Sequence, residues 1–268
     1  MSTISLPAYT GEQRVTQFRV VRSEWTKLRS LPSTIWSLLT AVTLIVGFGV
    51  VYAMVRVTRP PADPAAFDAA GVSLAGVQLA QLAVGVLGVL LVTGEFATGS
   101  IRLTLAAVPN RLPVLWGKAV VFGLTTLVLC VPAVVTAFVV GQSILSAEHL
   151  DTNLGEPGVA RAVLGSALFL AVVGLFGLGL GALLRNTAGG IASLFGLFFA
   201  PQMLVDLLPG SVSDHVYKYL PAPAGQAIMF VEPDPVLSLS PWAGLGVFAL
   251  YTAIALGLAA WLLRRRDA

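Results

Sequence analysis

The chain has 268 residues, of which 56% are hydrophobic and only 11% are charged, whereas about 25% are charged in an ordinary soluble domain. This composition is that of a membrane protein. The net charge of +3 is too small to indicate a nucleic-acid partner. The lone cysteine, Cys130, lies in an apolar run, so a disulfide within one chain is excluded and the side chain is interpreted as a small buried hydrophobe.

The first predicted element is a basic amphipathic helix over residues 12–31. Four apolar side chains at helical spacing share one face: Phe18, Val21, Trp25 and Leu28. Three arginines share a neighbouring face: Arg19, Arg22 and Arg29. Glu24 lies away from both faces. The pattern predicts an interfacial helix at the cytoplasmic headgroups, with the lipid bilayer as its partner; an irregular basic tail is the alternative.

Six apolar runs follow, each close to the roughly 20 residues that a helix needs to cross a hydrocarbon core. We expect spans at residues 35–55, 71–93, 119–141, 162–184, 188–208 and 242–263. The first run is longer than the apolar core of a cleavable signal, so it is predicted to be a retained span. The chain is therefore predicted to be an all-α polytopic membrane protein, with an N-terminal segment (1–34) and a six-helix transmembrane domain (35–268).

The basic residues indicate the orientation of these spans. If the N-terminus lies inside, 12 of the 16 Lys and Arg residues fall on cytoplasmic segments. The four on the other side are Arg56, Arg59, Arg161 and Lys218. By the positive-inside rule both termini are predicted to be cytoplasmic.

Three smaller patterns occur within and between the spans. Gly177 and Gly181 are small residues four apart, which is typical of close helix packing. Residues 222–231 are apolar but too short to cross, which makes them a candidate re-entrant segment before the sixth span. Several glutamines either line a substrate path or satisfy one another between helices: Gln78, Gln81, Gln142 and Gln202.

The sequence lacks the common signatures of catalysis. Gly117-Lys118 is followed by Ala119, so the nucleotide-binding P-loop pattern is missing, and neither HExxH nor GxSxG occurs. His149 and His215 are isolated, which favours solvated or structural roles over metal binding. The predicted span centres carry no ionisable residue of the kind that proton-coupled carriers use. We therefore expect no catalytic residue, no metal and no cofactor in this chain.

Two segments resemble the permease subunits of the ABC-2 class of bacterial ABC transporters, including those of drug-export and sodium-export type. One is Glu24-Trp25-Thr26-Lys27-Leu28-Arg29-Ser30, and the other is Thr93-Gly94-Glu95-Phe96-Ala97-Thr98-Gly99-Ser100-Ile101-Arg102. Ser100 stands where many relatives have threonine, and it keeps the hydroxyl. The topology of the whole chain is similar to that of the family, but the specific motifs lie within residues 14–118.

The resemblance implies a short cytoplasmic coupling helix over residues 98–107, between the second and third spans, which docks into a groove of a separate ATPase subunit. Glu95 would stand at the entrance of that helix, where a carboxylate favours the dipole of the helix N-terminus. Gly99 would permit close approach, and Arg102 would meet acidic groups of the partner or lipid phosphate. The expected contact residues are Glu95, Thr98, Gly99, Ser100, Ile101, Arg102, Leu103 and Leu105.

The family further implies two permease copies, identical or homologous, in the bacterial cytoplasmic membrane, with export of an unidentified substrate driven by the ATPase subunits. Two other classes stay open at this point. One is a secondary carrier or channel, whose transport would survive ATP depletion. The other is a membrane-embedded enzyme or assembly factor, which would need convergent polar groups inside the helix bundle.

Overall fold

The computed structural model describes residues 16–30, 32–59, 67–100, 112–205 and 207–265. Within these ranges the regular structure is helical, with no strand. Six of the described helices are long and apolar enough to cross a membrane. The prediction of an all-α polytopic protein with six spans is therefore confirmed, and the chain is a multi-pass membrane protein.

The first span is a continuous helix in three sections: α2 (Pro32–Thr43), the π-helical turn η1 (Leu44–Phe48) and α3 (Gly49–Thr58). The other five spans are α5 (Gly76–Ala97), α7 (Leu112–Leu145) with its extension η3 (Ser146–Glu148), α8 (Val159–Leu184), α9 (Thr187–Val205) and α12 (Pro241–Arg265). Shorter elements are α1 (Gln17–Ser30), α4 (Ala69–Ser73), α10 (Gly210–Tyr217), α11 (Pro221–Gln226) and η4 (Ala227–Met229).

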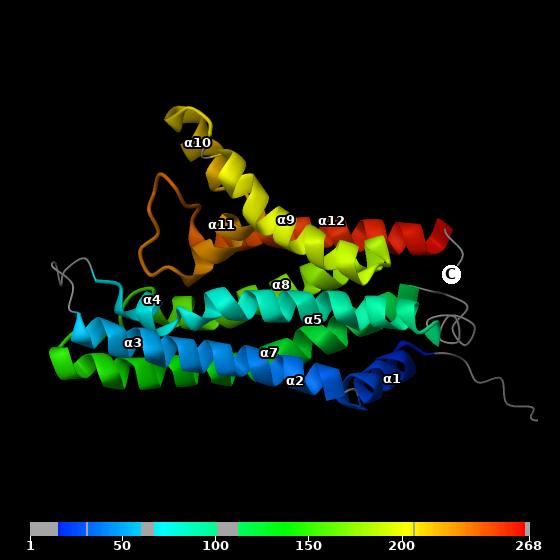
Figure 1. Cartoon of the computed structure of the whole chain (residues 1–268), viewed down its shortest axis with the longest axis horizontal. Helices are drawn as coiled ribbons and strands as arrows, with labels where there is room; N and C mark the ends of the chain where they lie inside the picture. The colour runs from blue at the N-terminus through cyan, green and yellow to red at the C-terminus, as the bar shows by residue number, and fades with distance from the viewer. Residues whose placement is uncertain (1–15, 31, 60–66, 101–111, 206, 266–268) are drawn as a thin grey trace, which may run out of the picture.

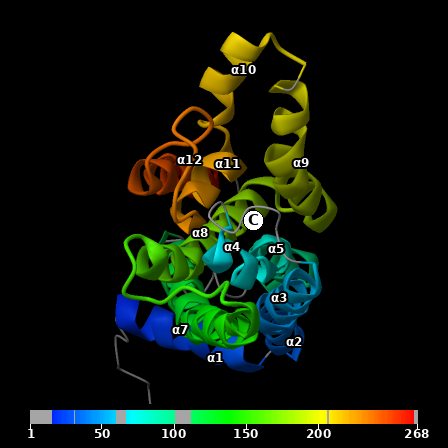
Figure 2. The same cartoon turned by 90° about the vertical axis from the view of Figure 1, so that its left-hand side faces the viewer.

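The spans form one bundle in which α5 and α8 are the most buried helices. Helix α9 diverges from the bundle toward α10, whereas α11 returns to the side of α12 (Figures 1 and 2). Helix α1 and the C-terminal end of α12 lie at the same end of the bundle (Figure 1), as an even number of crossings requires. We call this end the α1 end and the opposite one the far end.

Glycines allow α5 and α8 to pack backbone to backbone. A Cβ added at Gly177 would overlap the carbonyl oxygen of Gly85, and a Cβ added at Gly88 would overlap that of Gly174. At Gly181 the same atom would lie 2.8 Å from the carbonyl oxygen of Val89. The helix-packing role predicted for Gly177 and Gly181 is thus what the structure shows, and α5 and α8 form a close pair at the centre of the bundle.

The π-helical turn in the first span has a related steric origin that the sequence did not indicate. Gly76, the first residue of α5, lies directly against the carbonyl oxygens of Leu44 and Ile45. A π-helical turn inserts an extra residue into the helix, and here it coincides with the point at which another backbone approaches most closely.

The segment before the sixth span, where residues 222–231 were predicted to be a candidate re-entrant element, is packed within the protein. Six of its residues are buried: Ala222, Ala224, Gly225, Ala227, Ile228 and Met229. Arg161, near the start of α8, donates hydrogen bonds to the carbonyl oxygens of Ile228 (3.4 Å) and Val231 (2.9 Å). The guanidinium of Arg161 thereby fixes the end of this segment against α8.

The glutamines of the spans make protein contacts at the far end. Gln226 of α11 donates to the amide oxygens of Gln78 (3.0 Å) and Gln81 (3.3 Å) in α5. Gln142 of α7 donates to the backbone oxygen of Ala69 and to Ser73, and it accepts from the backbone of Thr152. Gln78, Gln81 and Gln142 therefore fit the interpretation in which polar side chains satisfy their hydrogen bonds within the protein, between helices.

The α5–α8 contact predicts the effect of adding one methyl group. Gly177→Ala forces α5 and α8 apart, and overpacking of this kind typically costs about 1–3 kcal/mol. We expect a lower thermal unfolding midpoint for the purified variant. The matched control is Gly257→Ala in α12, where an added Cβ meets nothing within 4 Å. Equal midpoints for the two variants would contradict the backbone contact.

Candidate functional site: a charge cluster at the α1 end

Helix α1 lies along the first turns of α7 and is held there by its own side chains. The residues that it buries recur every fourth position: Val20, Glu24 and Leu28. A Cβ added at Gly117 of α7 would lie 3.1 Å from the side chain of Val20, so the two helices are in direct contact. Gln17 donates to the backbone oxygen of Pro113 at 3.2 Å.

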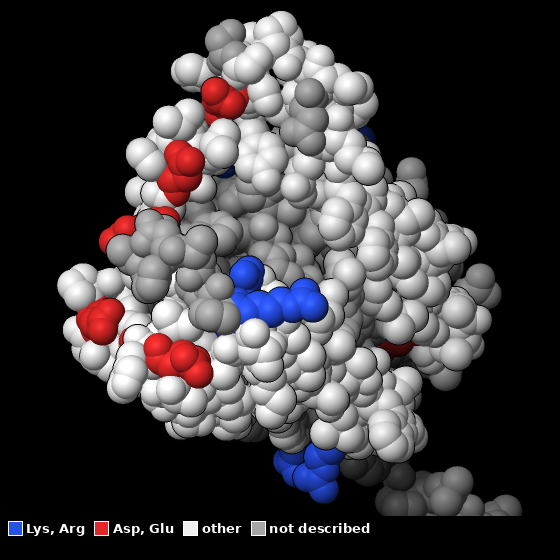
Figure 3. Space-filling model, turned by 60° about the vertical axis from the view of Figure 1, so that its left-hand side comes forward, with Lys and Arg blue, Asp and Glu red and all other residues white. Residues whose placement is uncertain are grey.

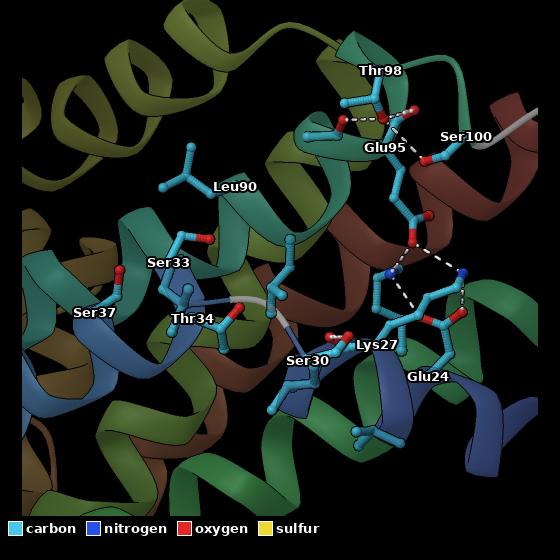
Figure 4. A pocket seen from close by; sticks show the side chains of 16 residues that line it. Glu24, Lys27, Ser30, Ser33, Thr34, Ser37, Leu90, Glu95, Thr98 and Ser100 are labelled. Carbon is cyan, nitrogen blue, oxygen red and sulfur yellow. Dashed lines mark hydrogen bonds and ion pairs between the residues drawn. The ribbon is translucent and has the colours of Figure 1, made fainter.

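Four charged side chains from three helices meet behind α1; we call them the charge cluster. Lys118 of α7 donates to Glu24 Oε2 at 2.7 Å and to Glu95 Oε1 at 3.0 Å. Lys27 of α1 donates to Glu24 Oε1 at 2.8 Å and to Glu95 Oε1 at 3.1 Å. Figure 4 shows Glu95 pointing from the end of α5 toward Glu24 and Lys27. The cluster therefore joins α1, α5 and α7.

The cluster is largely removed from water. The side chain of Glu24 is 2% exposed, that of Lys118 is 9%, that of Glu95 is 14% and that of Lys27 is 37%. Two carboxylates and two ammonium groups sum to zero formal charge, which offsets much of the cost of burying each ion. Removal of any one member leaves the cluster with one buried charge that is not compensated.

The two α1 members of the cluster have shifted pKa values. Burial alone would raise the pKa of Glu24, but the ammonium groups of Lys118 and Lys27 outweigh burial and hold the pKa below its ordinary value. Burial alone would lower the pKa of Lys27, but Glu24 and Glu95 outweigh it and raise the pKa. Both groups are thus held in their charged forms at neutral pH.

The structure corrects two sequence-based expectations. Glu24 was placed away from the faces of the amphipathic helix, yet it is the most buried residue of the cluster, because Lys118 lies opposite it. Glu95 was expected at the entrance of the coupling helix, but it lies in the last turn of the preceding helix, α5, and the argument from the dipole of the coupling helix stays a prediction. A sequence signal for Glu24 did exist, since it lies four residues from both Val20 and Leu28.

The predicted ATPase-contact residues are described only in part. Thr98 ends α5 and donates to the backbone oxygen of Gly94 at 2.9 Å, and the hydroxyls of Thr98 and Ser100 are 3.0 Å apart. Gly99 has φ +70°, a left-handed conformation that favours glycine. The remaining contact residues, with the rest of the predicted coupling helix, lie outside the described residues: Ile101, Arg102, Leu103 and Leu105.

The predicted interfacial residues all lie on α1, but they face different ways. Leu28 is buried and Val21 is half-buried against the bundle. Phe18 is 75% exposed and Trp25 is also exposed, as are the three arginines of the neighbouring face: Arg19, Arg22 and Arg29. Part of the predicted apolar face thus packs on protein, and the exposed aromatic and basic residues stay candidates for contact with headgroups.

A cavity of about 390 Å³ opens beside the charge cluster, between α1, α2 and α5 (Figure 4). One part of its wall carries hydroxyl groups: Ser30, Ser33, Thr34, Ser37, Thr98 and Ser100. Another part is apolar: Leu28, Leu87, Leu90, Leu91 and Val121. The four members of the charge cluster line the cavity as well.

The far end of the bundle has a different electrostatic character. Acidic side chains are scattered over the face that Figure 3 shows, with a small group of basic side chains near its middle. A polar cavity at this end is lined by acidic residues and one histidine: Asp68, His149, Asp151, Glu156 and Glu232. Among the described residues, no group of three or more His, Cys, Asp or Glu side chains is placed to hold a metal ion.

Comparison with protein-family models and with curated proteins gives no match for this chain.

The cluster predicts how charge reversals combine. Glu24→Lys and Lys118→Glu each leave buried charges unpaired, and breaking a buried pair typically costs about 3–5 kcal/mol. Each single variant should unfold at a markedly lower temperature, and the double variant should recover part of the loss. Arg22→Ala, at an exposed position of α1, is the control and should change stability by at most about 0.5 kcal/mol. A double variant no more stable than either single one would rule out the pairing.

The pKa shifts predict a pH window for this stabilisation. Because the pKa of Glu24 is lowered in the folded protein, its contribution is complete above the ordinary value of 4.5 and is lost as the pH falls through the lowered value. Because the pKa of Lys27 is raised, its contribution is complete below 10.5 and is lost as the pH rises through the raised value. The difference in unfolding temperature between the natural chain and Glu24→Gln should be largest near neutral pH. It should shrink as the pH falls below 4.5 and through the lowered pKa of Glu24. A difference independent of pH would contradict the ion pairs.

Proposed function

We propose that the chain is the membrane-spanning permease subunit of an ATP-binding-cassette transporter, which exports a substrate across the bacterial cytoplasmic membrane with energy from separate ATPase subunits. The observation that carries the proposal is the charge cluster. It connects the amphipathic helix α1 to the last turn of α5 and the second turn of α7, the two helix ends that flank residues 98–111. The resemblance of residues 24–30 and 93–102 to ABC-2 permeases supports the same function.

The geometry suggests how a pull on residues 98–111 would reach the spans. A displacement of residues 98–111 moves Ser100, just after α5, and pulls on Leu112, the first residue of α7. Glu95 and Lys118 lie within one or two helical turns of these residues, so they would move as well. The cluster passes the same displacement to α1 through Glu24 and Lys27. Since α5 is locked to α8 by backbone contact, the centre of the bundle would move with it. ATPase closure would then bias the bundle between two arrangements.

The distribution of charge favours an external energy source over ion coupling. In the described parts of the spans, the charged side chains lie near helix ends: Arg56, Glu95, Lys118, Glu148, Arg161, Arg264 and Arg265. Carriers driven by an ion gradient place such groups at mid-membrane, where protonation or ion binding changes the buried charge. The missing P-loop supports the part of the proposal that places nucleotide hydrolysis in another chain.

A second permease copy would cover surfaces that one copy leaves open. Helix α9 diverges from the bundle (Figure 1) and exposes large apolar side chains along its outer half: Leu197, Phe199, Met203 and Leu204. Helix α12 also exposes apolar and aromatic residues, among them Trp242, Leu250 and Trp261. Pairing through these faces would enclose a path between two bundles, as the proposed transporter requires.

The proposal predicts which protein lies next to Ser100. The variant Ser100→Cys is made in a Cys130→Ala background and is labelled with a photoactivatable maleimide in cells that produce the chain. We expect it to crosslink to a protein with a P-loop sequence, which mass spectrometry would identify. Leu154→Cys is the control, because Leu154 is exposed in the loop between α7 and α8. It should give no such product.

The same experiment separates the competing functions. Crosslinking of Ser100→Cys to no nucleotide-binding protein, under conditions in which Leu154→Cys is labelled equally well, would overturn the permease assignment and leave the secondary carrier as the better reading. Addition of ATP with vanadate should change the yield at Ser100→Cys only, because closure of the ATPases alters the contact at residues 98–111.

A further inference from the structure

The cavity beside the charge cluster contains polar groups that the protein itself leaves without partners. Thr34 is 2% exposed, and its hydroxyl makes no hydrogen bond to any described residue. The hydroxyls of Ser33 and Ser37 on the same helix also have no partner within the described ranges. Glu95 Oε2 is buried and accepts no hydrogen bond. Ser33 is exposed and Ser37 is half-buried, so their hydroxyls face the cavity without requiring a partner. Buried polar groups are nearly always satisfied, and the buried Glu95 Oε2 therefore points to a ligand.

The charge cluster determines what kind of head group fits. Glu95 Oε1 accepts from both Lys27 and Lys118, and Glu24 uses both of its oxygens for the same two ammonium groups. The atom left over, Glu95 Oε2, is an acceptor. A ligand must therefore bring a hydrogen-bond donor to it, and a positively charged donor binds a carboxylate most strongly. The hydroxyls of α2 can donate in turn to oxygen atoms of the same ligand.

The opposite wall determines what lies behind the head group. Leu87, Leu90 and Leu91 form an apolar strip on α5, and Leu90 is 36% exposed at the surface of the bundle. This strip leads from the charge cluster toward the surroundings of the spans, which are hydrocarbon in a membrane protein. A cavity of about 390 Å³ is at the small end of the range for ligand sites, so it holds a head group and the beginning of a chain.

We propose that this cavity is a binding site for a membrane phospholipid with a primary ammonium head group. The ammonium donates to Glu95 Oε2, and the hydroxyls of Ser33, Thr34 and Ser37 donate to the phosphate and glycerol oxygens. One acyl chain leaves along Leu87, Leu90 and Leu91. Lipid is the amphiphile that always surrounds the spans, so the occupant needs no separate delivery. The site depends on the membrane fold and the charge cluster, and it does not rest on the proposed transport function.

The test compares lipids that differ only in the head group. The purified full-length chain is reconstituted in bilayers with equal amounts of phosphatidylethanolamine, phosphatidylcholine and phosphatidylglycerol bearing the same acyl chains, then extracted gently and analysed by native mass spectrometry. Phosphatidylcholine is the matched probe, because its quaternary ammonium has no N–H. We expect retained phosphatidylethanolamine to exceed phosphatidylcholine by about tenfold, the ratio that one charge-assisted hydrogen bond supplies.

Three variants tie the retained lipid to this cavity. Ser37→Phe fills the cavity and should abolish the preference, and Thr34→Val removes one hydroxyl at nearly constant volume and should weaken it. Thr126→Val is the matched control, because Thr126 is buried in α7 and its hydroxyl is bonded to the backbone oxygen of Phe122. The control should retain the full preference.

Each other outcome contradicts the proposal. Equal retention of the three lipids, or a preference that survives Ser37→Phe, would remove the site from this cavity. A preference for phosphatidylglycerol would show that a neutral hydroxyl is the donor and would overturn the ammonium assignment. If Ser37→Phe fails to insert in the membrane, the comparison of Thr34→Val with Thr126→Val decides by itself: equal phosphatidylethanolamine retention by those two variants would exclude the cavity.

Discussion

The burial of two carboxylates and two ammonium groups at one end of the bundle constrains everything around it. A charge held near hydrocarbon must keep its counterion within contact distance, because the cost of leaving it alone exceeds the gain from most packing interactions. Helix α1 cannot move along α7 without separating Glu24 from Lys118, and neither helix can leave α5 without exposing Glu95. Three segments that are far apart in sequence are thus fixed relative to one another by electrostatics, while the rest of the bundle is held by apolar contact and by the hydrogen bonds of Arg161 and the glutamines.

Much of the architecture followed from the sequence, because crossing a membrane imposes a length and a composition that one segment must satisfy alone. The six spans could be placed for this reason, although α7 proved longer than its apolar core and α5 begins only after the short helix α4. The packing role of Gly177 and Gly181 was also predictable, since the spacing of small residues on one helix indicates close approach whatever the partner. Such features are local, and a local pattern suffices to predict them.

The features that sequence patterns missed all depend on partners distant in the chain. Glu24 has no evident role in the pattern of the amphipathic helix alone, because its partner is Lys118, 94 positions away. The position of Glu95 was misjudged because α5 continues past the end of its apolar run, so that a residue assigned to the entrance of the following helix belongs to the preceding one. Nothing in residues 44–48 indicates a π-helical turn, whose cause is the neighbouring backbone at Gly76. The free hydroxyls of α2 became meaningful only beside a carboxylate from another helix.

The clamp formed by Arg161 has a consequence for the order in which the two ends of the protein are completed during synthesis. The charge cluster needs only residues up to Lys118, so its charges can be neutralised before α8 has been made. Arg161 must wait for the carbonyl oxygens of Ile228 and Val231, which follow it by 67 and 70 positions. The guanidinium at the far end therefore lacks these two bonds until α9, α10 and α11 have also been made. In a chain made from its N-terminus, the contacts of the charge cluster thus become available before those of Arg161.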